Sequence, residues 1–240
     1  IFSQFPLAFR IKYSYYELKF TKKLKGQRER TMFGALLNYE QKGQTITLQY
    51  EKQIARIQVL TNKVINVFVP FAANDRRSKA IEGEKELPTP FTLDKTEDCL
   101  VLSTDSVVCR IYHDFMIDFY DREGRLLCAD YRGQRKARFE PKASFIELAR
   151  LEGHDVNDAG IQNYPVQCVK QLDEADCIYG LGDKTGVLNK RYYEYENWNS
   201  DIPDPHEDCF KSLYKSIPFF ITVKENGIYG IFYDNTFKSY

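Results

Sequence analysis

The side chains best suited to chemistry lie in one glycine-rich and aromatic-rich stretch, residues 177–199. It reads C-I-Y-G-L-G-D-K-T-G-V-L-N-K-R-Y-Y-E-Y-E-N-W-N. Its glycines favour a sharply turning loop, because glycine adopts positive φ and lets another backbone approach closely. Aromatic faces stack on pyranose rings, and carboxylates and amides bind hydroxyl groups in pairs. The composition therefore suits a sugar site, although a turn followed by an ordinary aromatic strand fits the same residues.

A phosphate-binding loop is not expected, although Lys184 and Thr185 follow two glycines in this stretch. The phosphate-binding motif needs four residues between its glycines and a glycine directly before the lysine. Here Asp183 precedes the lysine, and its charge would repel a phosphate. No long helix pattern follows that could add the dipole of a helix N-terminus. The sequence therefore argues against nucleotide binding.

Four sequence blocks carry a family resemblance when they are taken in order. They are Y-G-L-G-D-K-T-G with L-N-K-R, then Y-E-N-W-N-S-D, then L-Y-K-S-I-P-F-F-I, and finally Y-G-I-F-Y-D-N-T, and they span residues 178–236. In this order and spacing they resemble the N-terminal domain of family 31 glycoside hydrolases, the α-glucosidase family. Residues 50–70 and 109–130 are compatible with the same domain. The resemblance therefore covers most of the chain after about Thr45.

The resemblance implies that the catalytic residues lie outside this chain. Glycoside hydrolysis needs two carboxyl groups, roughly 5 to 5.5 Å apart in retaining enzymes. In the family, both are aspartates on a (β/α)8 barrel that follows the sandwich. The sequence stops at Tyr240 before any alternation of strands and long helices, so we expect no catalytic pair and no activity of these residues alone. The expected partners are the protein's own C-terminal barrel and, with it, an α-glucoside or oligosaccharide substrate.

Asp201 is expected to bind substrate, together with Asn199 and Trp198. In family members, the loop after the W-N-x-D block projects into the mouth of the barrel, and its aspartate binds sugar hydroxyls near the leaving-group side. Asp201 matches that aspartate. The alternative is that Asp201 only caps the turn before Pro203. The acidic cluster beside His206 is interpreted as a solvated loop; its members are Asp204, Glu207 and Asp208.

Two other functions fit the same type of sandwich. A mutarotase-like epimerase needs a histidine acid and a carboxylate base. The candidate histidines are His113, His154 and His206, and none lies in a recognisable pattern. A carbohydrate-binding module without catalysis is favoured by the aromatic residues. A change in anomer interconversion would indicate the epimerase, whereas sugar binding without turnover would indicate the module.

The segments around the glycine-rich stretch predict an all-β domain. Residues 45–50 alternate apolar and polar side chains, as a half-buried strand does, and residues 55–60 and 64–69 continue the pattern. Further strands are predicted at residues 100–104, 107–112, 115–120, 126–128, 166–169, 178, 216–223 and 228–233, with hairpin turns at 121–124 and 226–227. Many short strands separated by turns indicate a β-sandwich. The resemblance sharpens this prediction to a two-sheet antiparallel β-sandwich of the galactose-mutarotase-like (supersandwich) type.

Residues 1–44 form an N-terminal segment that is distinguished from the sandwich domain at 45–240. Its first 31 residues are rich in Lys and Arg, with Tyr and Phe interleaved. A nucleic-acid-binding arm would have this composition. However, the formal net charge of the whole chain is zero, so no wider basic face supports such binding. We therefore expect strands or an extension of the sandwich here.

Composition narrows the remaining classes. Zero net charge and the lack of an 18-residue apolar run argue against nucleic-acid and membrane partners. The six cysteines show no C-x-x-C or zinc spacing, so we expect no metal, no cofactor and a cytoplasmic location. A homodimer is also expected, because a strand near residues 230–233 is predicted to expose an unpaired edge.

Overall fold

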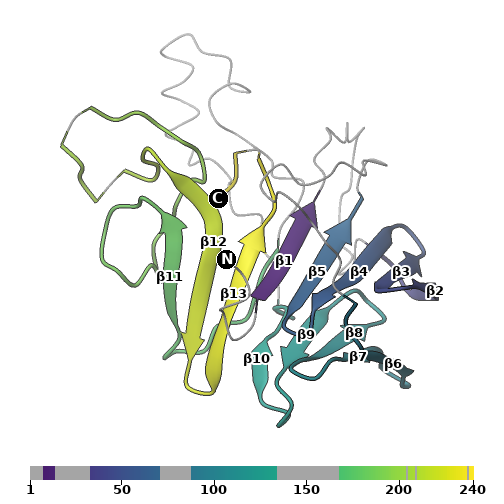
Figure 1. Cartoon of the computed structure of the whole chain (residues 1–240). Helices are drawn as coiled ribbons and strands as arrows, with labels where there is room; N and C mark the ends of the chain where they lie inside the picture. Colours follow the sequence, from purple (N-terminus) through teal and green to yellow (C-terminus); the bar gives the residue numbers. More distant parts are fainter. Residues whose placement is uncertain are drawn as a thin grey trace.

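The computed structural model describes residues 8–13, 33–70, 88–133, 168–203, 205–208, 210–236 and 238–240, with the backbone alone for residues 8–13. These residues form two β-sheets packed face to face (Figure 1), which confirms the predicted all-β sandwich. Among them there is no helix, and hence none that could cross a bilayer. Most of the segment at 1–44 lies outside the described residues.

The larger sheet has eight strands. In spatial order they are β11 (Cys177–Gly182), β12 (Ser216–Lys224), β13 (Gly227–Tyr233), β1 (Ala8–Tyr13), β5 (Val64–Val69), β4 (Ile54–Thr61), β3 (Thr45–Tyr50) and β2 (Leu36–Lys42). The smaller sheet has five strands in the order β10 (Leu126–Cys128), β9 (Ile117–Tyr120), β8 (Val108–Tyr112), β7 (Cys99–Ser103) and β6 (Thr92–Lys95). Both β1 and β2, from residues 1–44, lie in the same sheet as strands of the 45–240 region.

The core lies between the two sheets. Along β3, Ile46, Leu48 and Tyr50 are fully buried and alternate with more exposed residues, as the period of two requires. From the facing sheet, Leu100 and Leu102 of β7 join the same hydrophobic cluster. All six residues of β5 are buried, so this central strand is covered on both faces of the sheet. Apolar burial on this scale is the main favourable term in folding.

β1 departs from the antiparallel prediction. It runs parallel to both of its neighbours, with Ala8 opposite Gly230 of β13 on one side and Val64 of β5 on the other. The other paired strands are antiparallel. The expectation of an unpaired strand near residues 230–233 is wrong, because β12 and β1 pair with the two edges of β13. The homodimer stays a prediction without the support of this unpaired edge.

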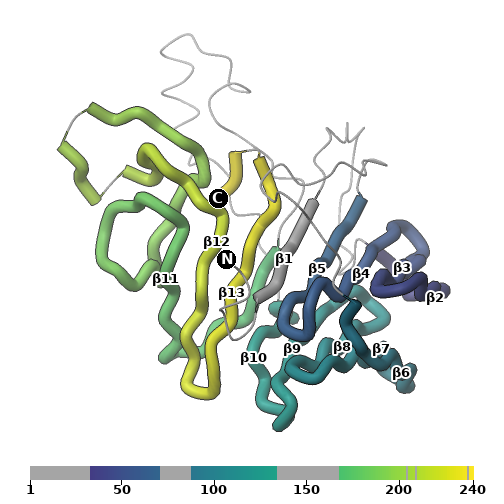
Figure 2. Tube along the Cα trace, in the orientation of Figure 1, coloured from purple at the N-terminus to yellow at the C-terminus, as the bar shows by residue number. Residues whose placement is uncertain are grey.

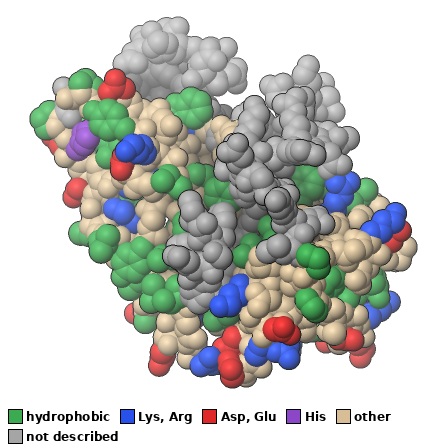
Figure 3. Space-filling model, in the orientation of Figure 1, with side chains coloured by type: hydrophobic (Ala, Val, Ile, Leu, Met, Phe, Trp, Pro, Cys, Tyr) green, Lys and Arg blue, Asp and Glu red, His purple; other side chains and the backbone are tan. Residues whose placement is uncertain are grey.

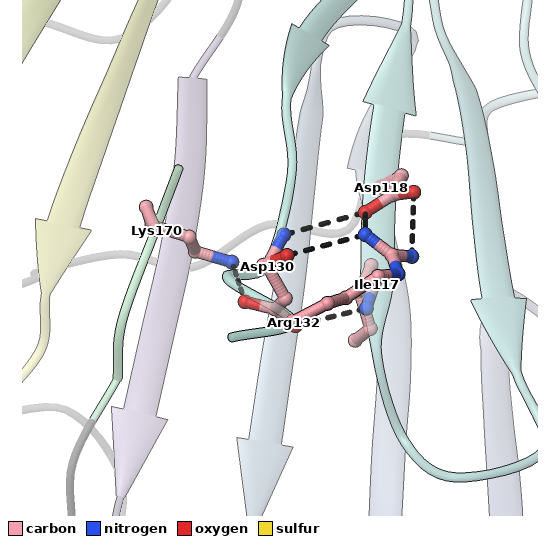
Figure 4. Close-up of polar contacts among 5 residues, drawn as sticks. All are labelled: Ile117, Asp118, Asp130, Arg132 and Lys170. Atoms are coloured by element: carbon pink, nitrogen blue, oxygen red, sulfur yellow. Dashed lines mark hydrogen bonds and ion pairs between the residues drawn. The ribbon is translucent and has the colours of Figure 1, made fainter. Parts of the chain in front are cut away.

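A four-charge network links β9, the segment after β10, and Lys170 (Figure 4). The Arg132 guanidinium donates to both carboxylate oxygens of buried Asp118, at 3.1 and 2.7 Å. Asp130 accepts from Lys170 Nζ at 2.7 Å and from the Ile117 backbone N–H at 2.8 Å. Each charge in the network thus faces an opposite charge, which is the arrangement that largely buried ions need.

Lys170 directly follows a predicted strand, residues 166–169. Residues 168 and 169, the two that are described, are not in a strand, and Lys170 forms an isolated bridge with Asp130. Burial would lower the pKa of Lys170. The neighbouring Cys168, Cys128 and Asp130 side chains oppose this effect, and the pKa ends well above its ordinary value. The lysine is therefore charged at neutral pH and paired with Asp130.

Candidate functional site

The glycine-rich stretch forms a β-bulge in β11, where this strand pairs with β12. Gly180, Leu181 and Gly182 have φ values of 125°, 72° and 79°, all in the region that favours glycine. A Cβ at Gly182 would lie 2.4 Å from the Lys215 carbonyl oxygen, and one at Gly180 would lie 2.7 Å from that of Phe219. These two glycines therefore permit close backbone contact, as predicted, and they act between two strands of the protein.

The chain that follows the bulge turns back and covers the edge of β11. Asn189 Oδ1 accepts from the Ile178 backbone N–H at 3.0 Å, and the Lys190 N–H donates to the Ile178 carbonyl at 2.7 Å. Figure 2 shows the loops between β11 and β12 on this outer side of the large sheet. The backbone groups of Ile178 are thus satisfied within the chain, which disfavours strand pairing with a second molecule at this point.

Lys184 lies beneath the aromatic part of the stretch. Its Nζ donates to the Glu196 carbonyl and, at 2.9 Å, to Ser216 Oγ. Burial lowers the pKa of Lys184 to about 8, although Glu196 and Asp183 act in the opposite direction. The ammonium therefore links the chain before Trp198 to the start of β12.

Tyr195 forms the centre of the loop core. Its side chain is buried, and its hydroxyl donates to the Thr185 carbonyl at 2.9 Å. Lys184 Nζ and Lys190 Nζ lie 6.0 and 5.6 Å from the centroid of its ring, within the range of a cation–π interaction. The Tyr193 ring stacks on Tyr195 at 5.8 Å. Tyr195 therefore stabilises the loop and is not a surface for sugar stacking.

The backbone of the predicted substrate residues is hydrogen-bonded to β12 and to the loop that precedes it. Ser216 Oγ accepts from the Trp198 N–H at 3.1 Å and donates to the Trp198 carbonyl at 2.8 Å, and the Ser212 hydroxyl donates to the same carbonyl. Asn199 Oδ1 accepts from the Ser216 backbone N–H at 2.8 Å. The Ser200 N–H then bonds to the Leu213 carbonyl at 2.9 Å. The backbone of residues 198–200 is thus fixed by neighbours on both sides.

The three predicted site residues differ in what their side chains do. The Trp198 side chain is 49% exposed, and Asp201 is exposed. Within the described part of the chain, no hydrogen bond or ion pair engages the Asp201 carboxylate, so a cap on the turn before Pro203 has no support there. Asn199, in contrast, uses its side-chain oxygen to hold β12. The structure leaves Trp198 and Asp201 available to a ligand and gives Asn199 a supporting contact.

Other aromatic and basic residues of the stretch are likewise either exposed or engaged in contacts within the chain. Tyr192 is 86% exposed and has a φ of 70°, with the Arg191 guanidinium 5.0 Å from its ring centroid. Arg191 itself donates to the carbonyls of Asp173 and Asp176, so it anchors the turn before β11. In Figure 3, hydrophobic side chains are scattered over the surface beside β11 and β12. Tyr192 joins Trp198 among the exposed aromatics there.

The described histidines give no support to the epimerase alternative. His113 Nε2 hydrogen-bonds with the Glu97 carbonyl at 3.0 Å in a turn of the small sheet. His206 Nε2 hydrogen-bonds with the Ile202 carbonyl at 3.2 Å, in the loop between β11 and β12 of the large sheet. The two histidines therefore belong to different sheets. His154, Asp204 and Cys209 lie outside the described residues.

Residues 54–240 match the glycosyl hydrolase 31 N-terminal galactose mutarotase-like domain. The chain belongs to this family. The GH31 N-terminal domain is 30% identical over 188 residues to alpha-glucosidase 2 from Bacillus thermoamyloliquefaciens, a match that covers 78% of this chain and 21% of that relative. The chain thus spans about a fifth of the length of the curated relative.

Solved structures share the fold of this GH31 domain. A GH31 dextranase from Flavobacterium johnsoniae superposes with a TM-score of 0.65 at 24% identity, over 88% of this chain and 23% of that one. The cycloalternan-forming enzyme from Listeria monocytogenes gives 0.55 at 12% identity, over 79% and 16% of the two chains. At these identities the likeness establishes the sandwich fold.

Sequence reasoning did not find the residues that hold the GH31 site segment in place. Lys184 was considered only as a phosphate ligand, and Ser212 and Ser216 were not singled out. The spacing of Ser212 and Ser216 in the S-L-Y-K-S run is a weak signal. Their roles follow from tertiary contacts with Trp198, which no local pattern specifies.

Proposed function

We propose that this sandwich serves an α-glucosidase-type glycoside hydrolase, in which it packs on a (β/α)8 catalytic barrel of the same polypeptide and contributes residues 198–201 to the sugar-binding site. One observation carries the proposal. The backbone from Trp198 to Ser200 is fixed by β12 and its preceding loop, while the Trp198 indole and the Asp201 carboxylate remain exposed. A fixed backbone that presents unoccupied polar and aromatic groups is what a preorganised binding site needs.

The two exposed side chains suit a sugar. An indole ring offers a flat apolar face with little conformational entropy to lose. A carboxylate accepts two or more hydrogen bonds, so it can bind adjacent hydroxyl groups of one ring. The GH31 membership and the alpha-glucosidase relative support an α-glucoside or oligosaccharide as the substrate class.

The proposed chemistry is hydrolysis with retention, carried out by two carboxylates of the barrel. A retaining pair needs two free carboxyl groups roughly 5 to 5.5 Å apart. The largely buried carboxylates Asp118, Asp130 and Asp176 are instead paired with Arg132, Lys170 and Lys224. We therefore expect the 240-residue chain to be inactive on an aryl α-glucoside at high protein concentration. Turnover that a substitution within these residues abolishes would overturn this part of the proposal.

Replacing Asp201 in the full-length enzyme tests the binding role. The Asp201→Ala variant loses hydrogen bonds to a charged group, which are worth about 1.5–3 kcal/mol. We therefore expect kcat/KM on a disaccharide to fall roughly tenfold to a hundredfold without loss of the fold. Glu225→Ala is the matched control, because Glu225 is an exposed carboxylate in the turn between β12 and β13. Equal kinetics for the wild type and Asp201→Ala would remove Asp201 from the site.

A cytoplasmic location is also proposed. Cys99, Cys109, Cys128, Cys168 and Cys177 are free thiols in the described part of the chain. Thiols persist in the reducing cytosol, whereas disulfides are common in secreted proteins. Cell fractionation with an antibody against the domain tests this location, and recovery in the secreted fraction would contradict it.

A further inference from the structure

We propose that Lys184 is a positioning residue for the sugar-binding segment, and that it acts through Ser216 to fix the backbone that carries Trp198 and Asp201. The inference rests on the proposed function, because it concerns the same segment. It assigns a role to a side chain that does not itself belong to the exposed binding surface.

The hydrogen bonds of Ser216 Oγ are fully accounted for. A serine hydroxyl has one hydrogen to donate and two lone pairs that accept. Here the lone pairs accept from Lys184 Nζ at 2.9 Å and from the Trp198 N–H at 3.1 Å. The single hydrogen is left for the Trp198 carbonyl at 2.8 Å. Because the Lys184 ammonium and the Trp198 N–H can only donate, together they direct the Ser216 hydrogen to the Trp198 carbonyl.

Lys184 holds the same segment at a second point. Its Nζ also donates to the carbonyl of Glu196, two residues before Trp198. The position of Lys184 is in turn fixed by the bulge, since the preceding Asp183 N–H bonds to the Lys215 carbonyl at 2.8 Å. One ammonium group therefore connects the β11 bulge, the start of β12 and the chain that leads into Trp198.

Burial of the Lys184 ammonium is energetically unfavourable. Its two hydrogen-bond acceptors are neutral, and burial of a cation without a directly paired carboxylate is unfavourable. The nearby charged groups are the Asp183 and Glu196 carboxylates, and Glu196 is itself engaged by Lys238 at 2.9 Å. Lys190 lies against the same Tyr195 ring and adds a like charge. A side chain kept in this unfavourable setting is better explained by its placement of the segment than by a gain in stability.

Trp198 provides a direct readout, because it is the single tryptophan of the 240-residue chain. We expect Lys184→Met and Ser216→Ala to increase acrylamide quenching of the Trp198 fluorescence. Because Trp198 is already 49% exposed, complete release would at most about double its accessibility, so the quenching constant should rise by up to about twofold. Ser216→Thr keeps a hydroxyl at the same position and should restore wild-type quenching.

The control is Lys215→Met, which removes an exposed lysine next to Ser216. We expect its quenching to equal that of the wild type, with circular dichroism confirming the sheet content of every variant. The double variant Lys184→Met/Ser216→Ala should fall short of the sum of the two single variants, because both substitutions break the Lys184–Ser216 bond, while Lys184→Met also removes the bond to the Glu196 carbonyl. Unchanged quenching in Lys184→Met, an equal change in Lys215→Met, or additive effects in the double variant would each overturn the inference.

This experiment is independent of sugar binding. Asp201→Ala should leave Trp198 quenching unchanged while lowering turnover in the full-length enzyme. If the Lys184 variants behave as expected and Asp201→Ala has normal kinetics, the proposed function fails while the positioning of the segment stands. If Asp201→Ala loses turnover and Lys184→Met shows normal quenching, the positioning role fails alone.

Discussion

Two lysines in different regions of this domain have pKa values that are shifted in opposite directions. Lys170 lies in the charge network beside β9, where its ammonium is 2.7 Å from the Asp130 carboxylate and its pKa is raised. Lys184 lies beneath the substrate segment, where its hydrogen-bond acceptors are the Glu196 carbonyl and the Ser216 hydroxyl, and its pKa is lowered to about 8. Burial lowers the pKa of both, so the neighbouring groups determine the difference: Lys170 lies near Cys168 and Cys128 and contacts the Asp130 carboxylate, whereas Lys184 contacts no carboxylate among the described residues.

This difference distinguishes two regions. In the sandwich, paired charges contribute to stability, whereas around the substrate segment the contacts position exposed side chains. In the sandwich the charges are matched, so the network can lock β9 to the segment after β10. Around the substrate segment, the lysine charge is compensated only by neutral dipoles and by carboxylates at longer range. The predictions below test whether the two lysines have these separate roles.

The largest effect is expected from Asp130→Asn. This substitution leaves the Lys170 ammonium largely buried without its paired carboxylate, and breaking such a pair typically costs about 3–5 kcal/mol. Urea unfolding followed by circular dichroism measures the change in the free energy of unfolding. The control is Asp121→Asn, because its ion-pair partner Arg125 is solvent-exposed and such pairs contribute little. Equal losses for the two variants would contradict the role of the buried pair.

A smaller but still large loss is expected from Gly182→Ala. The added Cβ would lie 2.4 Å from the Lys215 carbonyl oxygen, and the φ of 79° is unfavourable for alanine. We expect a loss of roughly 1–3 kcal/mol, together with increased Trp198 quenching, because the clash lies next to Ser216. Gly124→Ala is the control, since it shares a positive φ but meets no atom within 4 Å. A similar quenching change in both variants would show that backbone strain alone is responsible.

Lys184→Met should cost less stability than Asp130→Asn, although Lys184 also makes two hydrogen bonds. The lost bonds are offset by removing the cost of burying an ammonium, so we expect a change below about 1 kcal/mol. Urea unfolding under the same conditions gives the comparison. A loss as large as that of Asp130→Asn would mean that Lys184 is a stability residue like Lys170.

The smallest effect is expected from pH. Because the folded-state pKa of Lys184 is about 8 and the unfolded value is near 10.4, the unfolded chain binds the extra proton between these values. The wild type should therefore gain stability relative to Lys184→Met as pH rises from about 8 towards 10. Solvent screening keeps the gain well under about 1.4 kcal/mol per pH unit. A difference that stays flat or falls over this range would contradict the lowered pKa.

The sandwich was predictable where each strand carries its own pattern. Residues 45–50 show clean alternation and form β3 with the predicted bounds. The hairpin predicted at Asn226-Gly227 is also present, with its turn one residue earlier, at 225–226, and Gly227 as the first residue of β13. β2 was anticipated only as part of the 1–44 segment, because it is an edge strand whose side chains are mostly exposed and whose sequence shows no clear alternation. β1 was only broadly anticipated, because its parallel pairing depends on strands far away in the sequence.

The position of the candidate site in the sequence was predictable, but the contacts that hold its backbone in place were not. The W-N-S-D block located Trp198 and Asp201 through the family resemblance, and the structure leaves both side chains exposed. The contacts of Lys184 and Ser216 could not be predicted, because they depend on the register shift between β11 and β12 at Gly180 and Gly182. Such a shift is set by tertiary packing and is invisible to a pattern of period two.

The parallel strand β1 also constrains the order in which the large sheet can form. β1 separates β11–β13 from β2–β5, so the two groups are joined by hydrogen bonds only when it is in place. Its pairing with β5 closes a short part of the chain, but its pairing with β13 brings together residues near the two ends of the sequence. During synthesis, one edge of β1 stays unpaired until β13 has left the ribosome. An unpaired strand edge can pair with another chain in that time. This sheet therefore closes last at its centre, so the completion of the C-terminal hairpin governs how long the nascent domain is exposed to misassembly.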